Sequence, residues 1–202
     1  NDIWFGGNTQ LNFTIAQGLD LFDSRSESIN LPGPSIANFK QKFLKYKFSG
    51  SHTLPIKKIN SKLKINAQAQ WTNDKLLAGE QITFGGPAIG RGYDAGSIAG
   101  ERGFGLSFEL SKDFFKQEIF NLSLSSYELF AFIDYAEAKI LNEPISGNPE
   151  RNSYLGSHGI GARFSEKSGL MVDFMIARAR NEIPSQDARR NPRIIISLIK
   201  PF

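Results

Sequence analysis

The chain has 202 residues, a net charge of +4 at pH 7, no cysteine and 40% hydrophobic residues. The lack of cysteine excludes disulfide bonds and thiolate metal sites. No apolar run approaches the roughly 20 residues of a transmembrane helix, which excludes a helical membrane protein. Lys and Arg are spread along the chain, so the small net charge does not support nucleic-acid binding. Because the chain begins at Asn1, without an initiator Met or a signal peptide, we expect that an upstream portion has been removed.

Hydrophobic residues alternate with polar ones along most of the chain, with the period of a β-strand rather than of a helix. The pattern is clearest between residues 59 and 71. One face of this predicted strand carries Ile59, Leu63, Ile65, Ala67, Ala69 and Trp71, and the other carries Asn60, Lys62, Lys64, Asn66, Gln68 and Gln70. One side of the strand therefore needs an apolar environment, and the other needs water.

The same alternation predicts eight strands, near residues 8–19, 38–50, 59–72, 102–112, 121–138, 155–165, 169–179 and 193–202. Most of them reach the length of about 9–11 residues with which a tilted strand crosses a bilayer. Strands of soluble sheets usually have only about 5–6 residues. We therefore predict an all-β, antiparallel fold whose strands span a membrane.

The connections between these strands alternate in length. Long ones are predicted at 20–37, 73–101, 139–154 and 180–192, and short ones at 51–58, 113–120 and 166–168. Outer-membrane barrels have short periplasmic turns and long outer loops, so the last strand should end at the periplasmic rim. Trp71, Phe104 and Tyr154 then lie near outer strand ends and Phe48 near an inner one, as expected of aromatic girdles. The alternative is that these rings fill the core of a soluble β protein.

The segment from Phe84 to Leu110, FGGPAIGRGYDAGSIAGERGFGLSFEL, is rich in glycine. Its glycines form neither a GxGxxG nor a Walker pattern, and the segment after them reads as a strand, which disfavours a phosphate-binding loop. From residue type alone, Arg91 reads as an exposed loop arginine and Asp134 as a strand-end residue that binds local backbone. The alternation, however, puts Asp134 on the same face as Glu128, which is the face turned to the interior.

Two motifs resemble those of a known family. Gly85-Gly86-Pro87, Gly90-Arg91-Gly92-Tyr93 and Gly100-Glu101-Arg102-Gly103 resemble its long extracellular loop and the strand after it, and Phe132-Ile133-Asp134-Tyr135 resembles a Phe-x-Asp segment on the next barrel strand. The chain is thus similar to the two-partner secretion transporters, the haemolysin secretion/activation proteins. Gly90 stands where this family usually has a β-branched residue, and Ala136 where it often has Gly.

The resemblance implies that the loop folds back into the barrel, where Arg91 pairs with Asp134 on the wall. A guanidinium in a narrow polar interior needs a carboxylate, which it can meet with two hydrogen bonds. The other residues implied to function are Gly90, Gly92 and Tyr93 at the loop tip, Phe132 beside Asp134, Gly85, Gly86, Glu101 and Gly103 at the loop base, and Phe202 as a C-terminal assembly signal.

No nucleophile elbow, paired-carboxylate signature or metal-ligand spacing occurs in the sequence, so we expect neither an enzyme nor a cofactor or metal site. The remaining polar residues singled out are interpreted as lining the interior: Lys45, Lys47, Lys62, Lys64, Glu109, Arg163, His52 and His158.

We predict that residues 1–202 form the C-terminal half of an outer-membrane β-barrel in a Gram-negative bacterium, and the resemblance implies a barrel of sixteen strands of which these are the last eight. The expected function is export of a secreted partner of the adhesin or haemolysin type. Its other partners are the lipid bilayer and the barrel assembly machinery, with no nucleic acid. One alternative is a factor that inserts other outer-membrane proteins, and a less favoured one is a soluble ligand-binding β-barrel.

Overall fold

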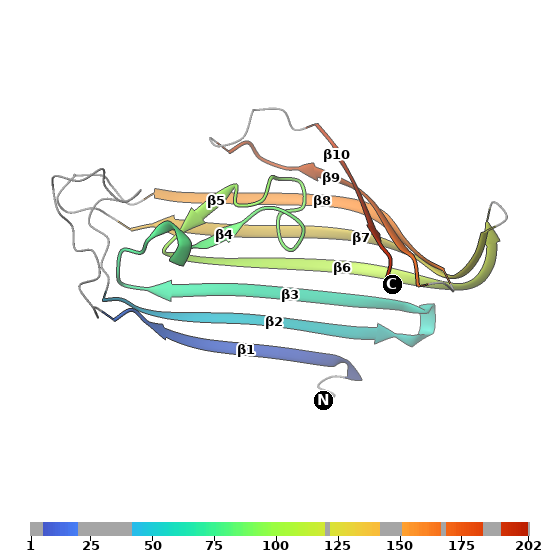
Figure 1. The fold of residues 1–202 in the computed structure, drawn as a ribbon, viewed down its shortest axis with the longest axis horizontal. Coiled ribbons are helices and arrows are strands. Elements are labelled where there is room, and N and C mark those ends of the chain that lie inside the picture. Colours follow the sequence, from blue (N-terminus) through green and yellow to red (C-terminus); the bar gives the residue numbers. More distant parts are fainter. Residues whose placement is uncertain are drawn as a thin grey trace.

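A computed structural model describes residues 6–19, 42–119, 122–141, 151–166, 169–183 and 191–201. They form one antiparallel sheet in the order β1-β2-β3-β6-β7-β8-β9-β10 (Figure 1). Its strands are β1 (Asn8–Gln17), β2 (Leu44–Ile56), β3 (Ser61–Thr72), β6 (Arg102–Ile119), β7 (Leu122–Ile140), β8 (Arg151–Glu166), β9 (Met171–Ala179) and β10 (Arg193–Ile199). The predicted all-β antiparallel class is confirmed. No helix in the described ranges is long and apolar enough to cross a membrane.

Several strands are longer than the alternation predicts. β2 continues to Ile56 and β6 to Ile119, so the short connections predicted at 51–58 and 113–120 are mostly strand. The sequence misled because Gly50 and Pro55 of β2 are residue types typical of turns. Phe48 consequently lies within β2 and not near its inner end, which corrects that prediction. The predicted start of this strand at 38–41 lies outside the described residues.

The two faces of the sheet differ as the alternation predicts. The outward face exposes large hydrophobic side chains on every strand, among them Leu11, Phe13, Trp71, Phe108, Leu129, Ile133, Ile160, Phe174 and Ile196. The inward face of β6 to β8 buries polar or small residues, including Ser107, Glu109, Asp134, Ala136 and Ser157. A soluble protein rarely exposes so extensive an apolar surface, whereas a membrane strand is apolar on its lipid side.

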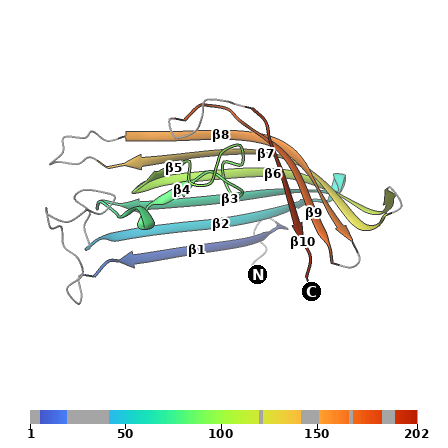
Figure 2. The same cartoon turned by 45° about the horizontal axis from the view of Figure 1, so that its top comes forward.

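The sheet is staggered from one edge to the other. Following the register across all eight strands, Asn8 at the start of β1 falls in the same row as Arg193 at the start of β10. β1 runs from this row toward one end of the sheet, and β10 runs toward the opposite end (Figures 1 and 2). Such a stagger is the shear that a closed barrel requires. In the described residues, however, no pairing joins β1 to β10, so the sheet is open.

The long connection predicted at 73–101 has structure of its own. It contains a 3-10 helix at Ala78–Glu80 and a small hairpin of β4 (Ile82–Phe84) and β5 (Ile98–Gly100). These strands contact β6, β7 and β8, so the connection folds back against the sheet (Figure 1). The hairpin was not predicted, because three-residue strands are too short for alternation to reveal.

The contrast between the two faces can be tested with neighbouring residues in the middle of β3. Ile65 lies on the outward face, and Asn66 lies on the inward face. In the complete protein refolded into lipid vesicles, we expect Ile65→Lys to lower the free energy of unfolding by about 2–4 kcal/mol, since the ammonium would face acyl chains. The matched variant Asn66→Lys should change it far less. Equal effects of the two variants in urea titrations would contradict the assignment of the faces.

Candidate functional site

The tip of the inward loop is a compact turn built on glycine. Gly85, Gly86 and Gly90 have φ angles of 108°, 91° and 92°, a region that side-chain-bearing residues rarely adopt. Three backbone hydrogen bonds close the turn: Gly85 N to Ile89 O at 3.0 Å, Gly86 N to Tyr93 O at 3.1 Å and Tyr93 N to Gly90 O at 2.9 Å. The turn holds Arg91 against the wall formed by β6, β7 and β8.

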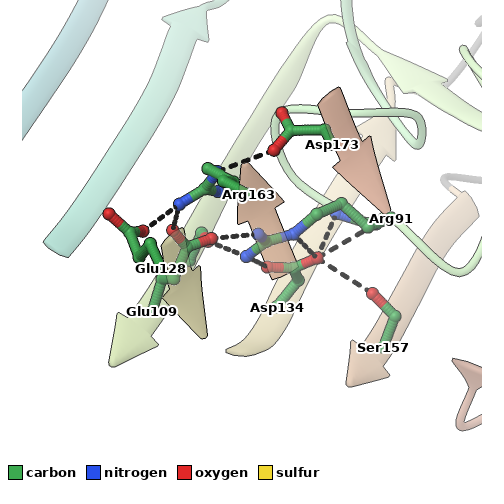
Figure 3. Close-up of polar contacts among 9 residues, drawn as sticks. Arg91, Glu109, Glu128, Asp134, Ser157, Arg163 and Asp173 are labelled. Atoms are coloured by element: carbon green, nitrogen blue, oxygen red, sulfur yellow. Dashed lines mark hydrogen bonds and ion pairs between the residues drawn. The ribbon is translucent and has the colours of Figure 1, made fainter. Parts of the chain in front are cut away.

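Arg91 meets Asp134 of β7 through both oxygens of the carboxylate (Figure 3). Arg91 Nη2 donates to Asp134 Oδ1 at 2.9 Å, and Nε donates to Oδ2 at 3.2 Å. The side chains are buried, with only 2% of Asp134 and 6% of Arg91 exposed. A two-pronged ion pair in such a place fixes the direction of the guanidinium as well as its charge.

Asp134 also accepts hydrogen bonds from the loop backbone and from the next strand. The backbone N–H groups of Gly90 and Arg91 donate to Oδ2 at 3.1 and 3.0 Å, and Ser157 Oγ of β8 donates to the same oxygen at 3.0 Å. Ser107 of β6 and Ser157 are the direct cross-strand neighbours of Asp134 on its two sides. The carboxylate therefore binds the turn itself and not only the arginine side chain.

The rest of the Arg91 guanidinium is also satisfied. Nη1 donates to Glu109 Oε2 at 2.5 Å, and Nη2 donates to Ser107 Oγ at 2.9 Å. The guanidinium carbon lies 3.5 Å from the centre of the Phe132 ring, so the cation also stacks on an aromatic face. A buried cation is costly unless it is paired and hydrogen-bonded, and here two carboxylates, a hydroxyl and a ring meet that need.

A second arginine, Arg163 of β8, continues the network along the wall (Figure 3). It reaches Glu109 Oε1 at 2.8 Å, Glu128 Oε1 at 2.5 Å and Asp173 Oδ1 at 3.2 Å, and it lies over the Phe130 ring at 4.1 Å. Phe130 and Phe132 are successive inward residues of β7. Each arginine lies over one of these two rings, so the two guanidinium groups occupy similar positions two residues apart along the strand. Glu109 is shared between them.

This network extends further, through Lys62 of β3. Its ammonium lies 3.0 Å from Glu128 Oε2 and 3.0 Å from Asp113 Oδ1. Charges of opposite sign thus alternate from Asp134 near the loop tip to Asp113 toward the opposite end of the sheet. Charges that alternate in this way largely compensate one another, so the interior face can hold many of them without a large net field.

Tyr93 anchors the other side of the loop tip. Its hydroxyl lies 3.0 Å from Gly156 O and 2.7 Å from Asn181 O, and it accepts from the Asn181 backbone N–H at 3.2 Å. The ring belongs to a buried apolar cluster that joins the loop to the wall and includes Phe84, Ile89, Ile98, Ala136, Leu155 and Ile183. The polar tip and this apolar cluster together hold the loop on the sheet.

Gly92 lies directly against the backbone at the end of β9. A Cβ at this position would be 2.7 Å from Ala179 N and 2.7 Å from the carbonyl carbon of Arg178, which is closer than real Cβ atoms come. Gly105 of β6 likewise makes room for the Phe84 ring, because its Cβ would fall 2.9 Å from Phe84 Cδ1. These glycines are needed for close approach of loop and wall.

Polar contacts also fix the base of the loop. Glu101 is fully buried, with Oε1 accepting from Gln81 Nε2 at 2.9 Å and Oε2 accepting from the Leu141 backbone N–H at 2.8 Å. Lys45, on the inward face of β2, forms an ion pair with Glu80. The loop is therefore bonded to β2 on one side and to the end of β7 on the other.

The residues predicted for the tip and the wall lie together. Gly90, Arg91, Gly92 and Tyr93 contact the wall at or beside Asp134 and Phe132, whereas Gly85 lies at the turn rather than at the loop base. Gly86 is also part of the turn, Glu101 is at the base, and Gly103 lies on β6 against Phe84 and Ile82. The predicted assembly signal Phe202 lies outside the described residues.

Two predictions about the interior are wrong. His52 and His158 were assigned to it, but their places in the register put them on the outward face, opposite Ile65 and Ile133 respectively. The prediction rested on the polarity of histidine and did not consider the parity of these residues within their strands. In the described part of the chain, no cluster of side chains could hold a metal ion.

Sequence reasoning also missed several residues that complete the site. Ser107, Ser157 and Asn181 were not singled out, and Glu109 was not recognised as a partner of Arg91. Strand parity puts Ser107 and Glu109 on the face of Asp134, which was a usable signal for both. Asn181 follows β9 in a connection, where no periodicity applies.

Comparison with known proteins agrees with this geometry. The profile of the family described as haemolysin secretion/activation protein ShlB/FhaC/HecB matches residues 2–164. The chain belongs to this family. Its members are outer-membrane transporters of Gram-negative bacteria, so the predicted family and location are confirmed.

In structure, this family member is similar to CdiB from Escherichia coli, with a TM-score of 0.74 and 20% sequence identity. The match covers 96% of this chain and 34% of CdiB, so the chain spans about a third of that protein's length. At this identity the likeness shows a shared β-barrel fold. No curated protein matches the chain in sequence.

The close approach at Gly92 predicts a specific sensitivity of the loop. We expect Gly92→Ala to lower the free energy of unfolding of the complete protein by about 1–3 kcal/mol, because the methyl group overlaps backbone that cannot move without disturbing β9.

Gly79→Ala is the matched control, since nothing lies within 4 Å of a Cβ at that position. It should change the stability by no more than about 0.5 kcal/mol. Urea-induced unfolding in vesicles measures both variants. If Gly92→Ala were as mild as the control, the loop tip would not be seated against β9.

Proposed function

We propose that this chain forms part of a pore that carries a secreted partner polypeptide from the periplasm to the cell surface. The observation that carries the proposal is the inward loop, whose tip is fixed by the buried pair of Arg91 and Asp134 on a polar face. A loop held inside a barrel can keep the pore narrow while leaving one side open for transport. In this role the loop is an internal strut.

A polar groove beside the loop tip supports the proposal. Its volume is about 450 Å³, and it lies between the loop and the inward side of β1 to β3. The residues on the strand side are largely uncharged and polar: Gln10, Asn12, Ser49, Ser51, Asn66 and Gln68, with Lys64 among them. Amides and hydroxyls exchange hydrogen bonds readily with water and with peptide groups, so an extended chain could slide past them without binding tightly.

The open edges of the sheet support a larger assembly. β1 and β10 would leave unpaired backbone groups in a bilayer, where such groups cost several kcal/mol each. We propose that further strands, giving about sixteen in all, close the barrel around the loop. The outward face would then contact lipid, and the barrel assembly machinery would insert the protein with Phe202 as part of its signal.

The partner that we propose is an exoprotein of the adhesin or haemolysin type, delivered unfolded. The proposal assigns no chemical step and no cofactor to the chain. The competing role is insertion of other outer-membrane proteins. The two roles predict different losses when the loop no longer holds its place against the wall. A transporter loses its secreted partner, whereas an assembly factor loses other barrels from the membrane.

The strut can be tested through Arg91→Ala. We expect this variant to lower the amount of partner protein at the cell surface by about tenfold or more, because the tip loses both of its carboxylate contacts. The amount of transporter in the outer membrane should remain near that of the wild type, since the substitution lies in the loop and alters no strand. Immunoblots of the culture medium and of the outer-membrane fraction measure the two quantities.

Lys58→Ala is the control, because Lys58 is an exposed cation in the turn after β2, far from the loop tip. It should leave secretion unchanged. Undiminished secretion by Arg91→Ala would count against the strut. Loss of unrelated barrels with normal partner export would instead favour the assembly role.

A further inference from the structure

Two side chains that carry N–H donors stand opposite one another on the outward face of the sheet. His158 of β8 and Arg178 of β9 are direct cross-strand partners, and both are exposed. They share the outward parity of Ile160 on β8 and Ile176 on β9. From this pair toward the start of β9 the face is apolar, with Ile160 on β8 and Phe174 and Ile176 on β9, so a histidine and an arginine side by side stand out.

The chain itself supplies no acceptor for this pair. The outward residues around it are Ile133 across from His158, Gly156 and Ile160 on β8, Ile176 on β9, and Arg180, whose side chain lies beside Gly156. None of these is acidic. Within the described ranges, no hydrogen bond or ion pair joins the side chain of His158 or Arg178 to another residue.

Two other polar residues on the outward face, His52 and Arg102, have partners in the chain. His52 shares a hydrogen bond of 2.8 Å with Thr9 Oγ1 on the neighbouring strand. Arg102 donates to Thr72 O and Asn73 Oδ1 and lies over the Trp71 ring at 4.8 Å. The pair of His158 and Arg178 therefore differs from His52 and Arg102, whose side chains are held within the chain.

The position of the pair matches the depth of lipid headgroups. Arg178 is the residue before the last of β9, at the end of the sheet that carries the inward loop. Tyr135 and Tyr154 are exposed on the same face nearby, and Tyr135 pairs with Gly156, two residues from His158. Tyrosines on the lipid side of a barrel gather at the membrane–water interface.

We propose that His158 and Arg178 bind the phosphate of a lipid headgroup in the surface-side leaflet. A planar guanidinium can hold two phosphate oxygens at once, and the imidazole N–H can donate to a third. The phosphate would balance the charge of Arg178 and satisfy donors that otherwise face an apolar environment. This inference rests on the outward face meeting lipid, and it is independent of which protein the pore exports.

Native mass spectrometry of the complete protein in detergent, titrated with lipid A, a phosphorylated lipid of the surface-side leaflet, tests the proposal. The wild type should retain bound lipid. The double variant His158→Gln, Arg178→Gln should need about tenfold more lipid for equal occupancy, because a charge-assisted contact to phosphate is lost. The single variant Arg178→Lys keeps the positive charge but lacks the planar guanidinium. The lipid concentration that it needs for equal occupancy should lie between those of the wild type and the double variant.

Arg151→Gln is the matched control, since Arg151 is an exposed arginine at the start of the same strand but of opposite parity. It should bind lipid as the wild type does. Wild-type retention by the double variant would overturn the proposal. Complete displacement of the lipid by millimolar inorganic phosphate would also overturn it, by showing an adventitious anion only. Partner secretion is measured separately, so failure here leaves the transport proposal standing.

Discussion

The structure depends on one buried cation. Arg91 comes from a loop that must leave water to lie inside the sheet, and its guanidinium can stay there only because Asp134 and Glu109 face it. Much of the surrounding architecture serves this pair. Glycines let the turn close and approach the wall, Phe132 provides a ring beneath the guanidinium, and Ser107 and Ser157 flank Asp134 from both neighbouring strands.

The pair also belongs to a network in which the charged side chains of the interior are held by partners of opposite sign. Glu109 is held by Arg163 as well as by Arg91, and Arg163 is in turn held by Glu128 and Asp173. If the loop withdrew, Glu109 would keep a cation, whereas Asp134 would keep only serine hydroxyls. The loop is therefore coupled to the wall chiefly through Asp134, and under the proposed function the polar groove beside it is the part of the interior open to a passing chain.

Strand alternation predicted most of the fold, since period two determines which residues face inward wherever one face is apolar. It failed where residue types conflict with strand geometry: Gly50 and Pro55 suggested a turn within β2, and the polarity of His52 and His158 suggested the interior. The pairing of Arg91 with Asp134 was reachable only through family resemblance, because the two are far apart in sequence. Parity could have added Ser107 and Glu109, but no periodic signal marks Asn181 or the β4–β5 hairpin.

The most direct test is a distance measurement across the interior by pulsed electron paramagnetic resonance. The chain has no cysteine, so labels can be placed at Ala95 on the loop and Lys58 in the turn after β2, both exposed. A narrow distance distribution is expected for the wild type and for the control Asp173→Asn, which affects only Arg163. Asp134→Asn should broaden it, because the loop loses its charged anchor. An unchanged, narrow distribution in Asp134→Asn would contradict the account.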